Sequence, residues 1–107
     1  DDQAVVREFL GEYLNASRRL AAEMRAAHIA ADFDQLGACA HKLKSASRAV
    51  GGRRLGDLCA ELEQACARGD AASAGEKMVQ FEAAYADVES DIEIRLAEGC
   101  VAVGRKA

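Results

Sequence analysis

The stretch DFDQLGACAHKLKSASRAVGG, residues 32–52, decides the fold. Asp32 is a favoured helix N-cap, and Gln35 stands where the partner residue of a capping box reaches back. Gly51 and Gly52 end the stretch with a residue type that tolerates the left-handed geometry of a helix C-terminus. Between these signals, apolar or small residues recur at steps of three and four: Leu36, Cys39, Ala40, Leu43, Ser47 and Val50. The stretch therefore predicts an amphipathic helix with one buried face.

Similar amphipathic patterns precede and follow this helix. The first segment places on one face Val6, Phe9, Leu10, Tyr13, Ser17, Leu20, Met24 and Ala27. It is either one long helix or a short helix and a longer one with a joint near Asn15. A further helix runs to about Arg68, with Leu55, Leu58, Cys59, Leu62 and Cys66 inward. Gly69 and Asp70 give a stop and a new N-cap. The last helix, fading by Glu98-Gly99, buries Ala74, Met78, Phe81, Tyr85, Val88, Ile92 and Leu96.

The composition agrees with an all-helical chain. Proline, which breaks helices, is absent from the 107 residues, and aromatic residues make up 5%. Short connections between four amphipathic helices make an antiparallel bundle the economical arrangement. We expect one all-α domain over residues 1–107, with its core at about 4–96 and a frayed C-terminal tail at about 98–107.

Charge and cysteine content exclude several classes of function. The net charge of −4 is modest, and acidic and basic residues are interspersed along the sequence. No run of basic residues therefore suggests binding to nucleic acid. No apolar run approaches the roughly 18 residues that span a bilayer. The start, Asp1-Asp2-Gln3, has neither Met nor a signal-peptide pattern, and we expect an excised or trimmed cytoplasmic domain. The four cysteines form no C-x-x-C pair, which favours small core residues over a metal site.

The outer face of the helix over residues 32–52 carries His41. At 100° per residue, this histidine projects opposite the apolar stripe, with Gly37 and Ser45 one turn before and after it. Its remaining small or basic neighbours are Ala38, Lys42, Lys44 and Arg48. Small residues leave the imidazole accessible to another protein, and the nearby cations suit a phosphoryl group. A mid-helix glycine costs about 1 kcal/mol relative to Ala, so an exposed Gly37 needs such a reason.

An ordinary explanation competes with this one. A surface histidine is usually a solvent-facing polar residue, and small residues are common in an alanine-rich chain. Geometry alone therefore does not decide for a functional His41. The second histidine, His28, is not flanked by small residues one turn before and after it, and it lies near a helix end. We therefore expect its role to be structural or incidental.

A longer motif around His41 resembles a known family. It comprises Ala40-His41-Lys42-Leu43-Lys44-Ser45-Ala46-Ser47, then Val50-Gly51, and on the next helix Leu55, Leu58-Cys59 and Leu62-Glu63. This pattern is similar to that of the histidine-containing phosphotransfer (Hpt) domains of bacterial multistep phosphorelays, over about residues 4–96. The resemblance implies a four-helix bundle with an additional N-terminal helix. The sequence departs from the family pattern at Ser45, where the family usually has glycine. The choice of partner and the rate of transfer therefore stay open.

The resemblance also implies a function. His41 matches the phosphorylated histidine, and Lys44 matches the lysine that helps to neutralise the phosphoryl group. The implied reaction is reversible transfer to and from receiver-domain aspartates of response regulators or hybrid sensor kinases, with Mg²⁺ supplied by the receiver. We expect Gly37, Ala38, Lys42, Ser45 and Arg48 to contact that partner, and the chain to be a monomeric phosphocarrier with no cofactor or metal of its own. It has no Gly-rich nucleotide loop for autonomous kinase activity.

Two alternatives remain at this point. The first is a helical interaction module that binds a receiver domain without carrying phosphate; the presence of both His41 and Lys44 weighs against it. The second is an enzyme or metal protein that uses His28, His41 and the cysteines, against which their scattered spacing argues.

Overall fold

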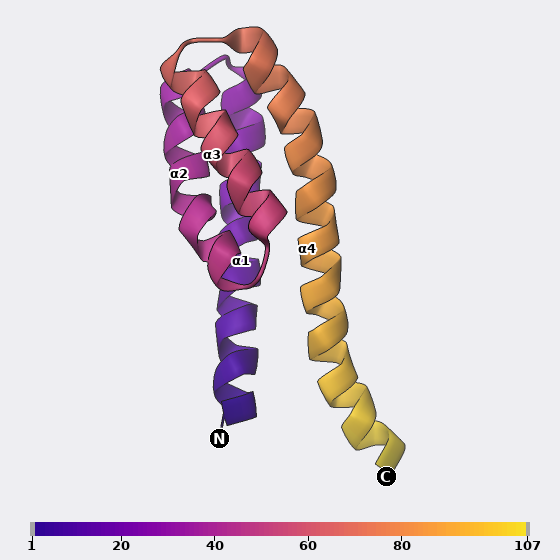
Figure 1. Cartoon of the computed structure of the whole chain (residues 1–107). Coiled ribbons are helices and arrows are strands. Elements are labelled where there is room, and N and C mark those ends of the chain that lie inside the picture. The colour runs from indigo at the N-terminus through magenta and orange to yellow at the C-terminus, as the bar shows by residue number, and fades with distance from the viewer. Residues whose placement is uncertain (1, 107) are drawn as a thin grey trace.

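Four helices account for the chain in the computed structural model, which describes the backbone of residues 2–106 and the side chains of residues 2–98. The helices are α1 (Asp2–Ile29), α2 (Phe33–Ala49), α3 (Arg53–Ala67) and α4 (Ala71–Lys106). Successive helices are joined by short turns and run in opposite directions (Figure 1). No strand occurs among residues 2–106, which confirms the all-α prediction. The expected tail at about 98–107 lies almost wholly outside the described side chains, and its fraying stays a prediction.

The start of α2 confirms half of the expected capping box. The Asp32 carboxylate Oδ1 accepts a hydrogen bond from the Gln35 backbone N–H at 3.1 Å. The Gln35 side chain does not reach back, however, and its Nε2 donates to Cys39 Sγ at 3.5 Å. The Asp32 N–H already donates to the Ala27 carbonyl at 2.9 Å, so the group that Gln35 was expected to satisfy has a partner. The reciprocal half of the capping box was therefore a wrong prediction.

The two glycine turns behave as the sequence predicts. Gly51 has φ +88° and Gly69 has φ +65°, the left-handed region that a residue without Cβ enters without strain. After Gly69, the Asp70 carboxylate accepts hydrogen bonds from the Ser73 N–H at 3.1 Å and from the Ser73 hydroxyl at 2.8 Å. These local interactions fix where α2 and α3 end and where α4 begins.

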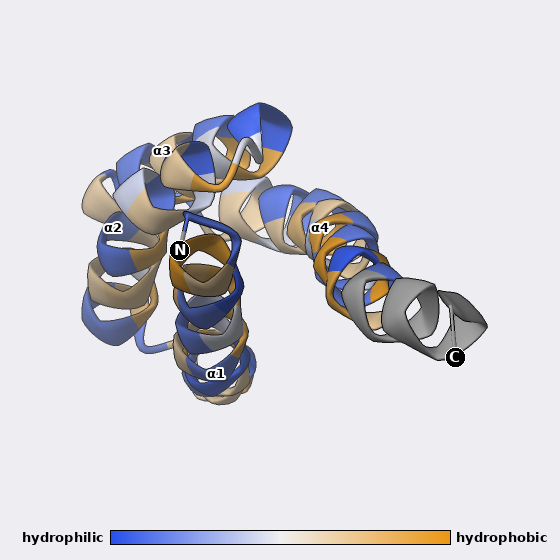
Figure 2. Cartoon of the chain, turned by 90° about the horizontal axis from the view of Figure 1, so that it is seen from below, coloured by the Kyte–Doolittle hydropathy of each residue, from blue (hydrophilic) through white to orange (hydrophobic). Residues whose placement is uncertain are grey.

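The buried faces of the helices form one core. The stripes predicted for α2, α3 and α4 are buried or half-buried, and the apolar side of α4 faces the other helices (Figure 2). Two buried hydroxyls also have partners: Tyr13 Oη lies 2.9 Å from Ser47 Oγ, and Ser17 Oγ lies 2.9 Å from Tyr85 Oη. Val6 and Phe9 were wrongly expected in the core, since they are 53% and 45% exposed.

The first segment is one continuous helix, so the additional N-terminal helix implied by the resemblance does not form as a separate element within residues 2–106. The physical reason lies around Asn15. Leu14 and Ser17, on either side of it, are both buried on the same face of α1, and no proline interrupts the backbone. The stripe therefore passes the expected joint without a break.

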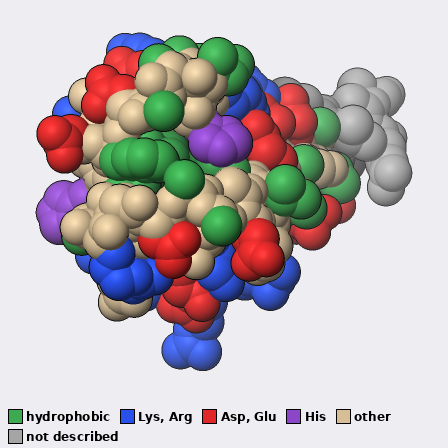
Figure 3. Space-filling view, turned by 90° about the horizontal axis from the view of Figure 1, so that it is seen from above, with side chains coloured by type: hydrophobic (Ala, Val, Ile, Leu, Met, Phe, Trp, Pro, Cys, Tyr) green, Lys and Arg blue, Asp and Glu red, His purple; other side chains and the backbone are tan. Residues whose placement is uncertain are grey.

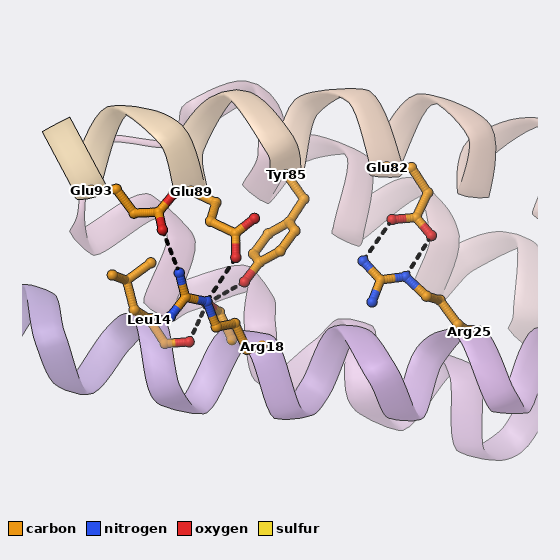
Figure 4. A network of polar contacts seen from close by, with 8 residues as sticks. Leu14, Arg18, Arg25, Glu82, Tyr85, Glu89 and Glu93 are labelled. Atoms are coloured by element: carbon orange, nitrogen blue, oxygen red, sulfur yellow. Dashed lines mark hydrogen bonds and ion pairs between the residues drawn. The ribbon is translucent and has the colours of Figure 1, made fainter.

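Ion pairs connect α1 to α4 (Figure 4). The Arg18 guanidinium donates to Glu89 at 2.7 Å and to Glu93 at 2.9 Å. About two turns further along α1, Arg25 donates to both carboxylate oxygens of Glu82, at 2.8 and 2.9 Å. These pairs line the exposed side of the contact, outside the buried core. Among the described residues, no helix combines the length and hydropathy that crossing a bilayer requires.

Candidate functional site

His41 stands near the middle of α2 with its side chain 65% exposed. Ala40, one residue before it, and Leu43, two residues after it, are 0% and 1% exposed and belong to the core. Because the opposite face of α2 is buried against α1 and α3, the backbone that carries the imidazole is held firmly while the ring remains accessible. The structure thus places His41 where the sequence predicts it.

The imidazole is part of a three-residue arrangement across α2 and α3. Its Nδ1 lies 2.8 Å from Oε2 of Glu63, and the Lys44 ammonium donates to Oε1 of the same carboxylate, also at 2.8 Å. The pKa of Glu63 is held below its ordinary value, first by the hydrogen bond from Lys44 and then by the one from His41. Glu63 is therefore a carboxylate that joins the two sequence-predicted site residues.

This contact selects a tautomer of His41. An ionised carboxylate can only accept hydrogen bonds, so the Nδ1 atom carries the ring proton. In the neutral imidazole, the lone pair then belongs to Nε2, the nitrogen on the far side of the ring from Nδ1. The arrangement presents Nε2 as the nucleophilic atom.

A shallow apolar groove of about 440 Å³ lies beside His41, between α2 and α3. Its lining residues are Phe33, Asp34, Gly37, Ala38, His41, Lys42, Glu63, Cys66 and Ala67. The space-filling view shows apolar side chains gathered next to a histidine (Figure 3). The structure thus brings Gly37, Ala38 and Lys42 together with His41, as the sequence predicts, and adds a second wall from α3.

Gly37 has a different reason for being glycine than the one expected. It is half-buried, and a Cβ at this position would lie 3.2 Å from the Cβ of Cys66 on α3. That distance is tighter than ordinary van der Waals contact, so α3 could not approach as closely if a side chain were present. The expectation of an exposed Gly37 was wrong, because α3 crosses α2 at this point and covers one side of the glycine.

The family of the chain follows from comparison with known proteins. The sequence model described as the Hpt domain matches residues 8–91, a range that contains His41, Lys44 and Glu63. The chain belongs to the Hpt domain family. Hpt domains act in phosphotransfer in two-component signalling, as phosphocarriers that interact with receiver domains. Neither the curated proteins nor the solved structures contain a significant match to the chain.

Two predicted contact residues of this Hpt domain lie away from the groove lining. Ser45 is exposed, one turn after His41. Arg48 packs over Gly56 of α3, where a Cβ would lie 2.6 Å from the Arg48 Cγ, and its guanidinium donates to Asp57 at 3.0 Å. Arg48 therefore contributes to the contact between α2 and α3. Lys42 is exposed, whereas the Lys44 side chain is 22% exposed.

The cysteines of the Hpt domain behave as core residues where they are described. Cys39 and Cys59 are buried and Cys66 is half-buried, all as free thiols. Burial raises the pKa of each, that of Cys59 to about 12. The described residues contain no group of three or more His, Cys, Asp or Glu placed to hold a metal ion. The prediction for Cys100 concerns a side chain outside the described residues. His28 lies in the last turn of α1 and is not among the residues that line the groove beside His41.

Glu63 is the residue of the candidate site that the sequence analysis missed. It appears in the quoted motif only as the end of Leu62-Glu63, and 22 residues separate it from His41. The signal that could have revealed it is its place on α3, one position after a core leucine. At that position a side chain emerges at the edge of the buried face, beside the neighbouring helix.

Proposed function

We propose that this Hpt domain is a phosphorelay intermediate in which His41 accepts a phosphoryl group from the aspartate of one receiver domain and passes it to the aspartate of another. The observation that carries the proposal is the Glu63 carboxylate bound to both the His41 Nδ1 and the Lys44 ammonium. Because both donors and acceptors of the phosphoryl group are receiver domains, we place the exchange in the cytoplasm.

The chemistry needs no proton transfer on this chain. The Nε2 lone pair of His41 forms the N–P bond while the P–O bond to the receiver's aspartate breaks, and that carboxylate leaves with the electron pair. The ring keeps its Nδ1 proton and acquires a positive charge, which the Glu63 carboxylate at 2.8 Å stabilises. In the second step the carboxylate of another receiver forms the new O–P bond, and the N–P bond returns its electron pair to Nε2.

Lys44 supplies positive charge close to the reacting nitrogen. Its ammonium is bound to Glu63 in the free domain, and a flexible four-carbon stem lets it turn from the carboxylate to a phosphoryl oxygen. The proposed docking surface is the apolar groove with Gly37, Ala38 and Lys42, extended by Ser45 at its edge. Mg²⁺, in this proposal, is bound by the receiver domain and supplies charge neutralisation there.

Transfer from a phosphorylated receiver tests the proposal. Each receiver domain of the source organism is phosphorylated with radiolabelled acetyl phosphate, freed of donor and mixed with the wild-type chain, His41→Gln or His28→Gln. We expect acid-labile label on the wild type and on His28→Gln, and none on His41→Gln. Label that persists in His41→Gln contradicts the proposal. Binding of a receiver without any transfer contradicts it as well and favours a helical interaction module that binds a receiver domain without carrying phosphate.

A further inference from the structure

One edge of α2 runs along α3 and carries four residues, Gly37, His41, Lys44 and Arg48. Each of them lies against a residue of α3. Gly37 belongs to the apolar groove, whereas Arg48 follows His41 by seven residues, which is about 10 Å along the helix axis. This edge is therefore apolar on one side of the histidine and basic on the other.

Arg48 is held in place on the surface of α3. Gly56 is buried, and a Cβ there would lie 2.6 Å from the Arg48 Cγ, so the missing side chain lets the arginine lie flat against the helix. The Arg48 guanidinium donates to Asp57 at 3.0 Å, and 46% of the arginine side chain stays exposed. Arg48 thus has a fixed position and a surface that is open to a partner.

Arg53, in the first turn of α3, adds a second cation beside Arg48. Arg48, Arg53 and Asp57 line one hollow of about 480 Å³. Asp57 is bound to Arg48, and Arg53 is exposed with no ion pair within residues 2–98. Two arginines and one carboxylate leave a net positive charge here. We call Arg48 and Arg53 the basic end of the edge.

The start of α3 places arginine where the helix dipole disfavours it. The helix begins Arg53-Arg54, has no acidic residue in its first turn, and receives no side-chain cap from Gly52. Negative side chains are favoured near a helix N-terminus by about 0.3–1 kcal/mol each, so arginines there oppose the dipole. Sequences break such local rules mainly where function requires it. The arginine side chains therefore point to a role outside the stability of α3.

We propose that the basic end binds an acidic patch on the receiver domain and so sets the orientation in which the receiver docks across His41. The inference rests on the proposed function, which makes a receiver the partner. A standard interface buries about 800 Å² on each partner, a patch roughly 30 Å across. A receiver centred on His41 therefore covers Arg48, about 10 Å away, and complementary charge at the rim of such a contact guides association.

Binding kinetics of a receiver domain test the proposal. The receiver with the highest affinity for the wild-type chain is used, and its association rate constant is measured by stopped flow at low ionic strength and in about 1 M salt. The variant is Arg53→Glu and the matched control is Arg54→Glu. Arg54 is exposed in the same turn, but it lines a hollow with Lys77 and Gln80 of α4, away from α2. Both substitutions change the net charge and the interaction with the helix dipole alike.

Arg53→Glu is expected to lower the association rate constant by about tenfold or more at low ionic strength, and Arg54→Glu by less than about twofold. In about 1 M salt, where the Debye length is about 3 Å, this difference is expected to disappear. Urea denaturation is expected to show both variants at least as stable as the wild type, because glutamate suits a helix N-terminus. An equal loss in the two variants, or a difference that salt leaves unchanged, overturns the proposal.

Charge reversal on the receiver locates the acidic patch. Its exposed Asp and Glu residues are replaced by Arg one at a time, and at least one replacement is expected to restore association with Arg53→Glu. Failure of every replacement to do so overturns the proposal. A receiver that binds as expected but transfers no phosphoryl group to His41 contradicts the proposed function and supports the docking orientation. A chain that binds no receiver overturns both.

Discussion

The Nδ1 atom of His41 lies 2.8 Å from the Oε2 atom of Glu63, although 22 residues separate the two along the chain. The hydrogen bond joins α2 to α3 at the exposed edge of the bundle, and Lys44 binds the other oxygen of the same carboxylate. One acidic side chain therefore sets both the orientation of the imidazole and the resting position of the nearby cation. Changes at Glu63 are expected to affect the other two residues together.

Glu63→Ala is expected to slow phosphoryl transfer to His41. Without the carboxylate, the imidazole loses both its fixed tautomer and the group that stabilises its positive charge after attack. A hydrogen bond to a charged group contributes about 1.5–3 kcal/mol, so its loss is expected to slow transfer roughly tenfold to a hundredfold. Rapid-quench measurement of the transfer rate checks this, with Glu61→Ala as the control, since Glu61 lies on α3 and pairs with Lys77 at 3.7 Å. Equal rates for the two variants contradict the role given to Glu63.

Lys44→Ala is expected to slow transfer more than Lys42→Ala does. Lys44 is held beside the imidazole through Glu63, whereas Lys42 is exposed on the other side of the histidine column. Loss of a group that stabilises developing charge is expected to slow transfer on the order of a hundredfold to a thousandfold. The measurement is the same transfer assay with one receiver at several concentrations, which separates docking from chemistry. A larger rate loss in Lys42→Ala than in Lys44→Ala contradicts the assignment of charge stabilisation to Lys44.

The carboxyl group of Glu63 is expected to titrate below the ordinary range near pH 4.3. Its pKa is lowered by Lys44 first and His41 second, so the interaction favours the ionised form. The contribution of the bridge to stability is therefore complete above the ordinary value and is lost as the pH falls through the lowered one. Carbon NMR of the labelled carboxyl group follows this titration. In Lys44→Ala the pKa of Glu63 is expected to move up, and a value unchanged by that substitution excludes the proposed cause.

Tyr13→Phe is expected to reduce stability, because it leaves the buried Ser47 hydroxyl without this partner. Such a loss costs about 1–3 kcal/mol in the free energy of unfolding, measured by urea denaturation. Ser47→Ala alone and the double variant complete a double-mutant cycle. The double variant is expected to lose less free energy of unfolding than the sum of the losses in the two single variants. Full additivity contradicts a direct interaction between the two hydroxyls.

The same tyrosine predicts how stability changes at alkaline pH. Burial raises the pKa of Tyr13 to about 12, while the unfolded chain titrates near the ordinary value of about 10. Between these values the folded state holds a proton that the unfolded state has lost, so stability falls as the pH rises. Urea denaturation at a series of pH values is expected to show a shallower fall in Tyr13→Phe. An identical fall of stability with pH in the wild type and in Tyr13→Phe rules out Tyr13 as the cause of that fall.

Helix boundaries were predictable because short-range chemistry sets them. Asp32, Gly51, Gly69 and Asp70 act within a turn or two of their own positions, through side-chain caps and left-handed backbone. The buried stripes followed from residue spacing alone. The fold and the location of His41 therefore lay within reach of the sequence.

The remaining features depend on contacts between helices. Glu63 meets His41 only when α3 packs against α2, and the same crossing turns Gly37 from an exposed residue into a close contact with Cys66. The exposure of Phe9 likewise depends on where a different helix ends. No spacing rule within one helix predicts these relationships.

The site of phosphorylation tests the central claim most directly. The chain, labelled with ¹⁵N in its histidines, is phosphorylated by its receiver and examined by NMR for coupling between phosphorus and the ring nitrogens. The account predicts one phosphoryl group, on Nε2 of His41, with the Nδ1 proton of that ring retained. Phosphorus attached to Nδ1 of His41, or to either nitrogen of His28, contradicts the account.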